Sequence, residues 1–124
     1  LDGLEDAYEA GRSMGTFGED CAAKYQFTRE QQDAFATASV QRAKAATESG
    51  AFAAEIVPVT VKTRAGETVV SVDEGPGKVK LEKIATLKPA FKKDGTITAA
   101  SSSSINDGAA ALVMMKASTA ASSA

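Results

Sequence analysis

Cys21 is the residue that could most directly do chemistry, because it carries the only thiol of this 124-residue sequence. A catalytic thiolate needs a neighbouring base or cation, and the sequence contains no histidine. The four-residue spacing of Phe17, Cys21 and Tyr25 places the thiol on one helix face with two aromatic rings. We therefore expect Cys21 to be a buried structural thiol, and we expect no histidine-dependent catalytic pair or metal site in these residues.

Four consecutive serines, Ser101–Ser104, precede a turn-forming stretch at residues 106 to 108 and form a second candidate. Hydroxyl groups beside a glycine turn can bind a phosphate group. The stretch lacks the Gly-Lys-Ser/Thr element of a phosphate-binding loop, and serines in a turn more often bond to their own backbone. Bonding to the backbone is therefore the favoured interpretation, and an anion site is the alternative.

Six lysines of the second half surround the Gly-Pro-Gly of residues 75 to 77, at positions 78, 80, 83, 88, 92 and 93. Such a basic rim is either solvated surface or a contact for a phosphorylated small molecule. The net charge of −2 gives no electrostatic case for binding nucleic acid or an anionic membrane. The sequence has no apolar run of about 18 residues and no signal-peptide pattern. Its single cysteine cannot form an internal disulfide, which fits a cytoplasmic protein, with a mitochondrion or another organelle left open.

The elements that position these residues follow from local patterns in a chain of about one domain. Apolar residues at helical spacing predict a short helix over residues 1 to 11. Thr16 and Glu19 predict a capping box for a second helix, which ends near Gln26. Thr28 and Gln31 predict another capping box, for a helix of about 20 residues that stops at residue 50, with residues 35, 38 and 45 on its apolar side.

The second half of the chain predicts strands and short turns. Alternating valines predict a strand over residues 55 to 63, and residues 68 to 73 return as its hairpin partner. Residues 74 to 78 have the composition of a loop, and residues 81 to 87 have the spacing of a short helix. Residues 117 to 124 are an Ala/Ser/Thr stretch typical of a frayed tail or an interrupted helix.

The apolar run Ala109–Met115 predicts a strand that is buried on both faces, with a buried helix as the alternative. Such a strand needs neighbouring strands, and the rest of the chain does not supply enough of them. From the residues alone, the chain is an α+β segment with an optional anion site and no complete catalytic set.

The sequence also resembles the thiolase family, and in particular its acetyl-CoA acetyltransferase members. The likeness runs in order through nearly the whole chain. It rests on the motifs Met14-Gly15-Thr16, Thr28-Arg29-Glu30, Glu55-Ile-Val-Pro-Val, Leu87-Lys-Pro-Ala-Phe, Asp94-Gly-Thr-Ile-Thr-Ala99 and Asn106-Asp-Gly-Ala-Ala-Ala. The resemblance implies an αβαβα sandwich with an inserted loop domain. Residues 1–98 would be that loop domain, which covers coenzyme A, and residues 99–124 would return to the N-terminal core with one core strand.

The resemblance implies that the chain is a fragment of an enzyme that condenses two acetyl-CoA molecules to acetoacetyl-CoA, reversibly, by transfer of an acyl group through a cysteine. The catalytic cysteines and histidine would lie outside these residues, so the chain alone would be inactive. Two alternatives are a non-catalytic coenzyme A-binding or interaction module and a 3-ketoacyl-CoA thiolase of broad range. Family members are dimers or tetramers, which implies a homo-oligomer.

Coenzyme A thioesters would be the substrates, and no separate cofactor is expected. By motif, the resemblance assigns the pantetheine and acyl path to Leu4, Met14, Ala90 and Phe91. It assigns contacts with the pantetheine amides to Ala99 and Ser103, and contacts with the nucleotide phosphate to Lys78 and Lys80.

The sequence departs from the family pattern in three places. Ser13 stands where many short-chain members have histidine, which affects the expected acyl length. Ala100-Ser101 replaces the usual Gly-Asn, and the arginine often found in the nucleotide loop is missing. A lysine could replace that arginine as a point charge but not as a two-pronged donor.

Overall fold

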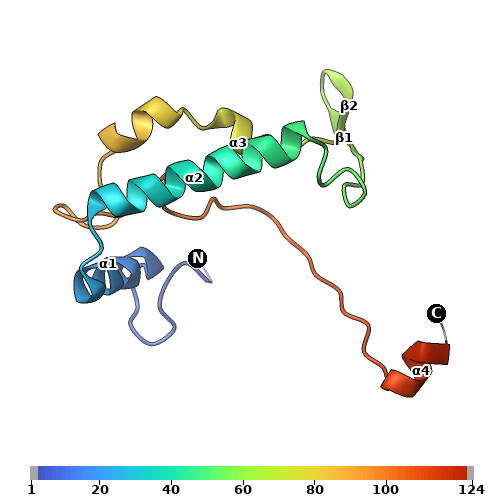
Figure 1. The fold of residues 1–124 in the computed structure, drawn as a ribbon, viewed down its shortest axis with the longest axis horizontal. Coiled ribbons are helices and arrows are strands. Elements are labelled where there is room, and N and C mark those ends of the chain that lie inside the picture. The colour runs from blue at the N-terminus through green and yellow to red at the C-terminus, as the bar shows by residue number, and fades with distance from the viewer. Residues whose placement is uncertain (1–2, 123–124) are drawn as a thin grey trace.

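The computed structural model describes residues 3 to 122, and Figure 1 shows that one long helix organises them. This helix, α2 (Arg29–Glu48), carries α1 (Met14–Tyr25) near its beginning and a two-stranded hairpin beyond its end. The short helices α3 (Gly75–Lys78) and η1 (Leu81–Thr86) lie along one flank of α2. The chain then passes along the opposite side and runs out to α4 (Ala117–Ser122). The expected α+β class is confirmed.

The start and end of α2 agree with the sequence prediction. Thr28 accepts a hydrogen bond from the Gln31 N–H at 3.2 Å, and the Gln31 side chain accepts one from the Thr28 N–H at 2.9 Å. This reciprocal capping box satisfies two N–H groups that an uncapped helix leaves without partners. Gly50 follows the helix with φ of +70°, a conformation that glycine adopts without strain.

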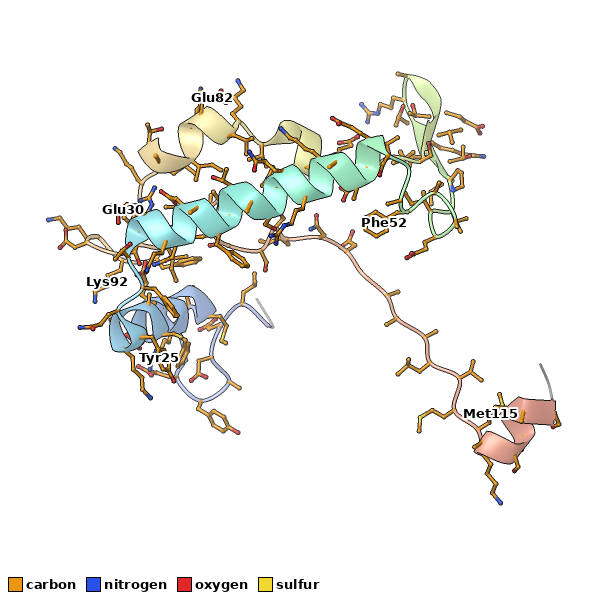
Figure 2. The ribbon with its side chains drawn as sticks, viewed as in Figure 1. Tyr25, Glu30, Phe52, Glu82, Lys92 and Met115 are labelled. Carbon is orange, nitrogen blue, oxygen red and sulfur yellow. The ribbon has the colours of Figure 1, made fainter. Side chains whose placement is uncertain are left out.

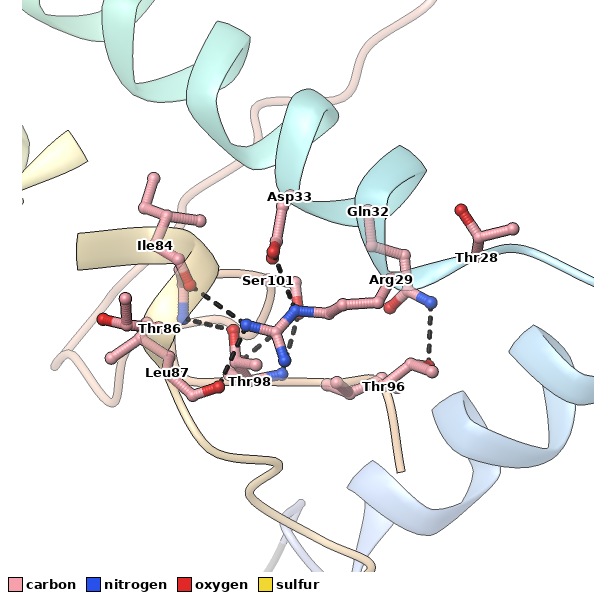
Figure 3. A network of polar contacts seen from close by, with 12 residues as sticks. Thr28, Arg29, Gln32, Asp33, Ile84, Thr86, Leu87, Thr96, Thr98 and Ser101 are labelled. Atoms are coloured by element: carbon pink, nitrogen blue, oxygen red, sulfur yellow. Dashed lines mark hydrogen bonds and ion pairs between the residues drawn. The ribbon is translucent and has the colours of Figure 1, made fainter. Parts of the chain in front are cut away.

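An arginine at the first turn of α2 attaches η1 to this helix (Figure 3). The Arg29 guanidinium donates to the carbonyls of Ile84 and Leu87, both at 3.0 Å, and to the Asp33 carboxylate at 2.8 Å. Ile84 is buried beneath this contact, with 2% of its surface exposed. The contact therefore closes a loop of more than 50 residues onto the helix. The predicted helix at 81 to 87 is present as a 3-10 helix.

The buried face of α1 differs from the prediction. The face turned toward the protein carries Gly15, Gly18, Glu19 and Ala22, whereas Cys21 is exposed and Tyr25 is 62% exposed. The expectation of a buried Cys21 is therefore wrong. The reason is that the two glycines allow another part of the chain to approach this face closely, whereas the larger side chains of the opposite face do not.

The predicted capping box of α1 is also wrong. Ser13, not Thr16, precedes the helix and accepts a hydrogen bond from the Gly15 N–H at 3.3 Å. Glu19 does not reach back to the cap, because its carboxylate is buried against residues 96 and 97. The end of α1 agrees with the prediction, with Gln26 in the left-handed conformation at φ of +57°.

Residues 3 to 13 form a loop rather than the predicted helix, and residues 1 and 2 of that prediction lie outside the described part of the chain. The Asp6 carboxylate accepts hydrogen bonds from the N–H groups of Tyr8 and Glu9, at 3.3 and 2.8 Å, which forms a turn in place of a helical turn. Glu5 then pairs with Ser13 in an isolated antiparallel bridge. The loop consequently returns Leu4 to the start of α1, where the Leu4 carbonyl accepts from the Met14 N–H at 2.9 Å.

The predicted hairpin is present as β1 (Val59–Thr63) and β2 (Gly66–Val70). The strands pair antiparallel with Val61 opposite Thr68, and the turn lies at residues 64 and 65. The stretch at 74 to 78, expected to be a loop, contains the single helical turn α3, and Pro76 in its first turn fits that position because proline needs no N–H partner there.

The predicted strand Ala109–Met115 is not formed. Residues 103 to 116 belong to no helix or strand. Figure 2 shows the later part of this segment, which leads to Met115, running clear of the rest of the molecule. Leu112 is 88% exposed. The physical reason is the absence of neighbouring strands within residues 3 to 122, since β1 and β2 pair only with each other there. Residues 117 to 122 form α4, which fits the interrupted-helix alternative, and residues 123 and 124 lie outside the described part of the chain.

The apolar core of the described residues is small. Ala22, Ala36 and Ile84 are its buried apolar side chains among residues 3 to 122. Phe35, predicted on the apolar side of α2, is 77% exposed. Polar contacts and close backbone approach, rather than a large core, hold the elements around α2 together.

Candidate functional site

A hollow of about 730 Å³ opens between the loop before α1 and the segment after η1. Four of the eight predicted coenzyme A contacts line it, namely Leu4, Met14, Phe91 and Ser103. These residues are up to 99 positions apart in the sequence. The fold therefore gathers apolar side chains and one hydroxyl around a single space, which suits a thin, mainly apolar ligand with polar groups at intervals.

Close contact with α1 sets the place of the Phe91 ring. A Cβ atom added to Gly15 would lie 2.3 Å from ring atoms of Phe91, so only glycine leaves room for the ring there. Met14 follows the Ser13 cap, lines the hollow and is 47% exposed. The opening of this hollow is thus bounded by the first turn of α1 on one side and Phe91 on the other.

A second hollow, of about 930 Å³, contains two more of the predicted residues, Lys78 and Ala99. It lies between α3, the middle of α2 and the chain after Thr98. Ser102 lines both hollows, so they meet at this residue. The arrangement places an ammonium group in one hollow and the apolar walls in the other.

The two remaining predicted residues, Ala90 and Lys80, line neither hollow. The Ala90 N–H donates to the Ile97 carbonyl at 2.9 Å and so closes the loop that carries Phe91. Lys80 is exposed just before η1, and its carbonyl accepts from the Lys83 N–H at 3.0 Å. A third hollow, of about 700 Å³ beside Phe27 and Phe35, includes Ser103 but none of the other predicted contacts.

The charge of Lys78 is partly compensated by a neighbouring carboxylate. Lys78 forms an ion pair with Glu74 one turn earlier. The hydrogen bond from the Lys78 ammonium, followed by its positive charge, lowers the pKa of the Glu74 carboxyl below the ordinary 4.5. Both groups are largely exposed, so the pair is screened by salt. The basic rim is therefore weaker at Lys78 than the sequence suggested.

The serine stretch uses part of its hydrogen-bonding capacity within its own turn. Ser102 donates to the Thr98 carbonyl at 2.8 Å, and Ser101 accepts from the Thr98 N–H at 3.0 Å. This agrees with the favoured interpretation, in which turn serines bond to their own backbone. Ser103 remains at the edge of the first hollow.

The described residues contain no assembled catalytic centre. Cys21 is exposed on α1 and faces no histidine, because the chain has none. Within residues 3 to 122 no group of three or more Cys, Asp or Glu side chains could hold a metal ion. Over the same residues, no helix has the length and apolar character needed to cross a bilayer. The arrangement can bind and orient a ligand, but it supplies no nucleophile and base.

Glu19 has a structural role at this site that no pattern in the sequence indicated. Its carboxylate accepts from the N–H groups of Thr96 and Ile97, both at 2.9 Å, although the partners are more than 75 residues away. The sequence did offer one signal of a closely packed helix face. The small residues Gly15, Gly18 and Ala22 lie at helical spacing around the Glu19 carboxylate. No local pattern could identify the loop that packs there.

The protein-family model for the thiolase N-terminal domain matches residues 1–118 of the sequence, so the chain belongs to the thiolase family. Among its relatives, the mitochondrial acetyl-CoA acetyltransferase of Gibberella zeae is 53% identical over 109 residues, which are 86% of this chain and 25% of the relative. The acetyl-CoA acetyltransferase of Thiocystis violacea is 51% identical over 122 residues, 97% of this chain and 31% of the relative. The chain thus spans between a quarter and a third of these relatives.

Solved structures give the same assignment of fold. The acetyl-CoA acetyltransferase of Bacillus anthracis superposes on 78% of this chain and 25% of its own, with a TM-score of 0.71 and 45% identity. The human mitochondrial 3-ketoacyl-CoA thiolase superposes on 77% of this chain and 24% of its own, with a TM-score of 0.66 and 40% identity. The resemblance to the family noted in the sequence is therefore confirmed.

Proposed function

We propose that this chain forms the coenzyme A-covering part of an acetyl-CoA acetyltransferase. In the proposed reaction the acyl group of one acetyl-CoA passes to a cysteine and frees coenzyme A. The enolate of a second acetyl-CoA then attacks the acyl-cysteine, which yields acetoacetyl-CoA and regenerates the thiolate. The cysteines and histidine of this reaction would come from parts of a thiolase polypeptide outside these residues.

One observation carries the proposal most directly. Four predicted contacts for coenzyme A, drawn from three separate segments, line one hollow with apolar walls and a hydroxyl at its edge. Pantetheine is a thin chain with two amide groups, so it matches apolar side chains interrupted by a few polar atoms. The relatives at about 50% identity are named as acetyl-CoA acetyltransferases, which supports the reaction class.

Each residue of the site has a distinct proposed role. The side chains that line the path of pantetheine and the acyl group are Leu4, Met14 and Phe91. The Ser103 hydroxyl donates a hydrogen bond to a pantetheine amide. Ala99 leaves room for the backbone of the ligand beside the second hollow, where Lys78 attracts the nucleotide phosphate. Ala90 contributes through its backbone bond to Ile97, and Lys80 contributes only long-range positive charge from outside both hollows.

In this proposal residues 1–98 are the loop domain and residues 99–124 enter the core of the enzyme. The extended apolar run 109–115 would then add to a sheet built by other parts of the polypeptide. We also propose a homo-oligomer, either a dimer or a tetramer, in the cytoplasm. Light scattering of the purified native protein and cell fractionation test these two statements.

The decisive experiment is an assay of acetoacetyl-CoA cleavage by coenzyme A with the native full-length protein, together with its intact mass. We expect two acetyl-CoA per acetoacetyl-CoA consumed, and trapping of an acetylated cysteine outside this chain. Binding of coenzyme A without cleavage would favour a non-catalytic binding module. Faster cleavage of longer 3-ketoacyl-CoA substrates would favour a thiolase of broad range, and absence of coenzyme A binding would reject the proposed site.

A further inference from the structure

The loop that bounds the first hollow is held by one face of α1. Gly15, Gly18, Glu19 and Ala22 recur at intervals of three and four residues, which places them on a single side of the helix. Opposite this face lies the segment 91–97, here called the wall loop. Added Cβ atoms would lie 2.3 Å from the Phe91 ring at Gly15 and 2.6 Å from Ile97 Cδ1 at Gly18.

The Glu19 carboxylate provides the polar part of this contact. Oε2 accepts from the Thr96 N–H at 2.9 Å, and Oε1 accepts from the Ile97 N–H at 2.9 Å. The Glu19 residue is only 6% exposed, so these bonds replace the water that a carboxylate would otherwise bind. A Cβ atom at Gly95 would lie 2.2 Å from Oε1, which shows how closely the loop wraps this group.

The long helix α2 holds the same point of the wall loop from another side. Gln32 of α2 donates to the Thr96 hydroxyl at 2.8 Å (Figure 3), and the Ala90 N–H donates to the Ile97 carbonyl at 2.9 Å. Thr96 is thus fixed between α1 and α2, and the loop is closed at its base. Since Phe91 lies inside this closed loop, its position depends on the hydrogen bonds of Glu19.

Ser103 depends on the same attachment through the next residues. Thr98 is completely buried directly after the bonded pair, and its backbone accepts from the side chain of Ser102. The chain leaves this anchor and reaches Ser103 at the edge of the hollow. Fixing the residues at 96 and 97 therefore sets two walls of the hollow at once.

We propose that Glu19 is a positioning residue for the coenzyme A site, acting through the wall loop rather than by touching the ligand. This inference deepens the proposed function and rests on it. Loss of the carboxylate releases the N–H groups of Thr96 and Ile97, so Phe91 and Ser103 no longer hold one arrangement. Ligand affinity falls, while the rate of the chemical step on bound substrate is little changed, because the reacting groups lie elsewhere.

The test compares Glu19→Gln with Asp20→Asn in the native full-length protein. Both changes replace a carboxylate with an amide on α1, but Asp20 is paired with Arg12 on the exposed side. For Glu19→Gln we expect KM for acetoacetyl-CoA and Kd for coenzyme A to rise about ten-fold, the usual scale for loss of a charge-assisted hydrogen bond. We expect kcat to change less than two-fold, and Asp20→Asn to leave all three values unchanged.

Hydrogen exchange of the amides at 96 and 97 provides a readout without ligand. We expect faster exchange in Glu19→Gln and partial restoration in Glu19→Asp, which keeps the charge. Unchanged exchange, an unchanged KM, or a loss confined to kcat would overturn the inference. A wild-type protein that binds no coenzyme A would instead reject the proposed function, and with it the ligand that Glu19 is proposed to serve.

A second variant covers the case in which Glu19→Gln does not fold. Gly15→Ala forces the Phe91 ring away from α1 and leaves the Glu19 carboxylate in place. We expect the same rise in KM with little change in kcat, because the ring enters the hollow. An unchanged KM in this variant would show that the α1 face does not set the hollow, and the inference would fail.

Discussion

The wall loop at 91–97 and the extended segment at 104–116 are both irregular, yet they differ in what holds them. The Glu19 carboxylate of α1 binds the backbone N–H groups of the wall loop, and Gln32 of α2 donates to its Thr96 hydroxyl. Thr98 directly after the loop is buried. The extended segment exposes nearly all of Leu112 and Val113 and belongs to no sheet. The difference teaches that irregular backbone takes one conformation where its polar groups are satisfied, and that apolar character alone does not position a chain without partners.

The largest expected effect contrasts a buried side chain of η1, which precedes the wall loop, with an exposed side chain of the extended segment. In the 124-residue chain, Ile84→Ala should lower the free energy of unfolding by about 3 kcal/mol, because it leaves a cavity below the Arg29 contact. Leu112→Ala removes a side chain of similar size from a position that is 88% exposed, so no measurable change is expected. Urea unfolding followed by circular dichroism measures both. Equal losses would show that the extended segment packs on the rest of the chain.

Two glycines sharpen the same comparison. Gly95→Ala introduces a Cβ atom 2.2 Å from the Glu19 carboxylate and should cost about 2 kcal/mol of unfolding free energy, as overpacking does. Gly108→Ala meets no atom within 4 Å and serves as the matched control. Thermal unfolding of both variants measures the two losses of stability. A stable Gly95→Ala variant would contradict the close packing of the wall loop on α1.

Ser103 lies at the boundary between the two regions. In the native full-length protein Ser103→Ala should weaken coenzyme A binding by about 1 kcal/mol, the net value of one hydrogen bond. Ser118→Ala lies beyond the extended segment, in α4, and should leave binding unchanged. Isothermal titration calorimetry with coenzyme A gives both values. If Ser103→Ala binds as tightly as wild type, this hydroxyl does not belong to the site.

The smallest expected effect concerns Lys78 at the second hollow. Glu74→Gln frees the lysine, so coenzyme A binding should tighten by less than about two-fold and become more sensitive to salt. Dephosphorylated coenzyme A should show neither change. Identical salt dependence of the two ligands would remove Lys78 from the phosphate contact.

The pH dependence of the ion pair between Glu74 and Lys78 follows from the lowered pKa of the Glu74 carboxyl. A carboxyl whose pKa is lowered in the folded chain stays ionised below its ordinary value of 4.5. The pair with Lys78 is therefore complete above pH 4.5 and is lost as the pH falls through the lowered pKa. The difference in thermal stability between wild type and Glu74→Gln should be constant from pH 8 to about 5 and vanish only at lower pH. A difference that vanishes near neutral pH would contradict the ion pair.

Local sequence patterns were sufficient for the elements whose determinants are close in the chain. The capping box of Thr28 and Gln31, the stop at Gly50 and the hairpin at 59–70 each depend on residues within a few positions of one another. Local residues also explain why the helix predicted at residues 1 to 11 is absent from residues 3–11, because the turn-forming Asp6 competes there with the helical spacing of apolar residues. Family motifs in the sequence then indicated the thiolase family, and the match to the thiolase N-terminal domain confirms it.

Only the tertiary structure decided which face of α1 is buried and which residues surround the hollow. The buried face of α1 is not the one that carries Cys21 between two aromatic residues. It is the one where Gly15 and Gly18 allow close approach and where Glu19 binds residues 96 and 97. These contacts join residues more than 70 positions apart, and local periodicity carries no information about such partners. The run 109–115 shows that a clear local pattern is also not sufficient to form an element. Its sequence determines an apolar, strand-like character, but a strand forms only where neighbouring backbones supply the hydrogen bonds of a sheet.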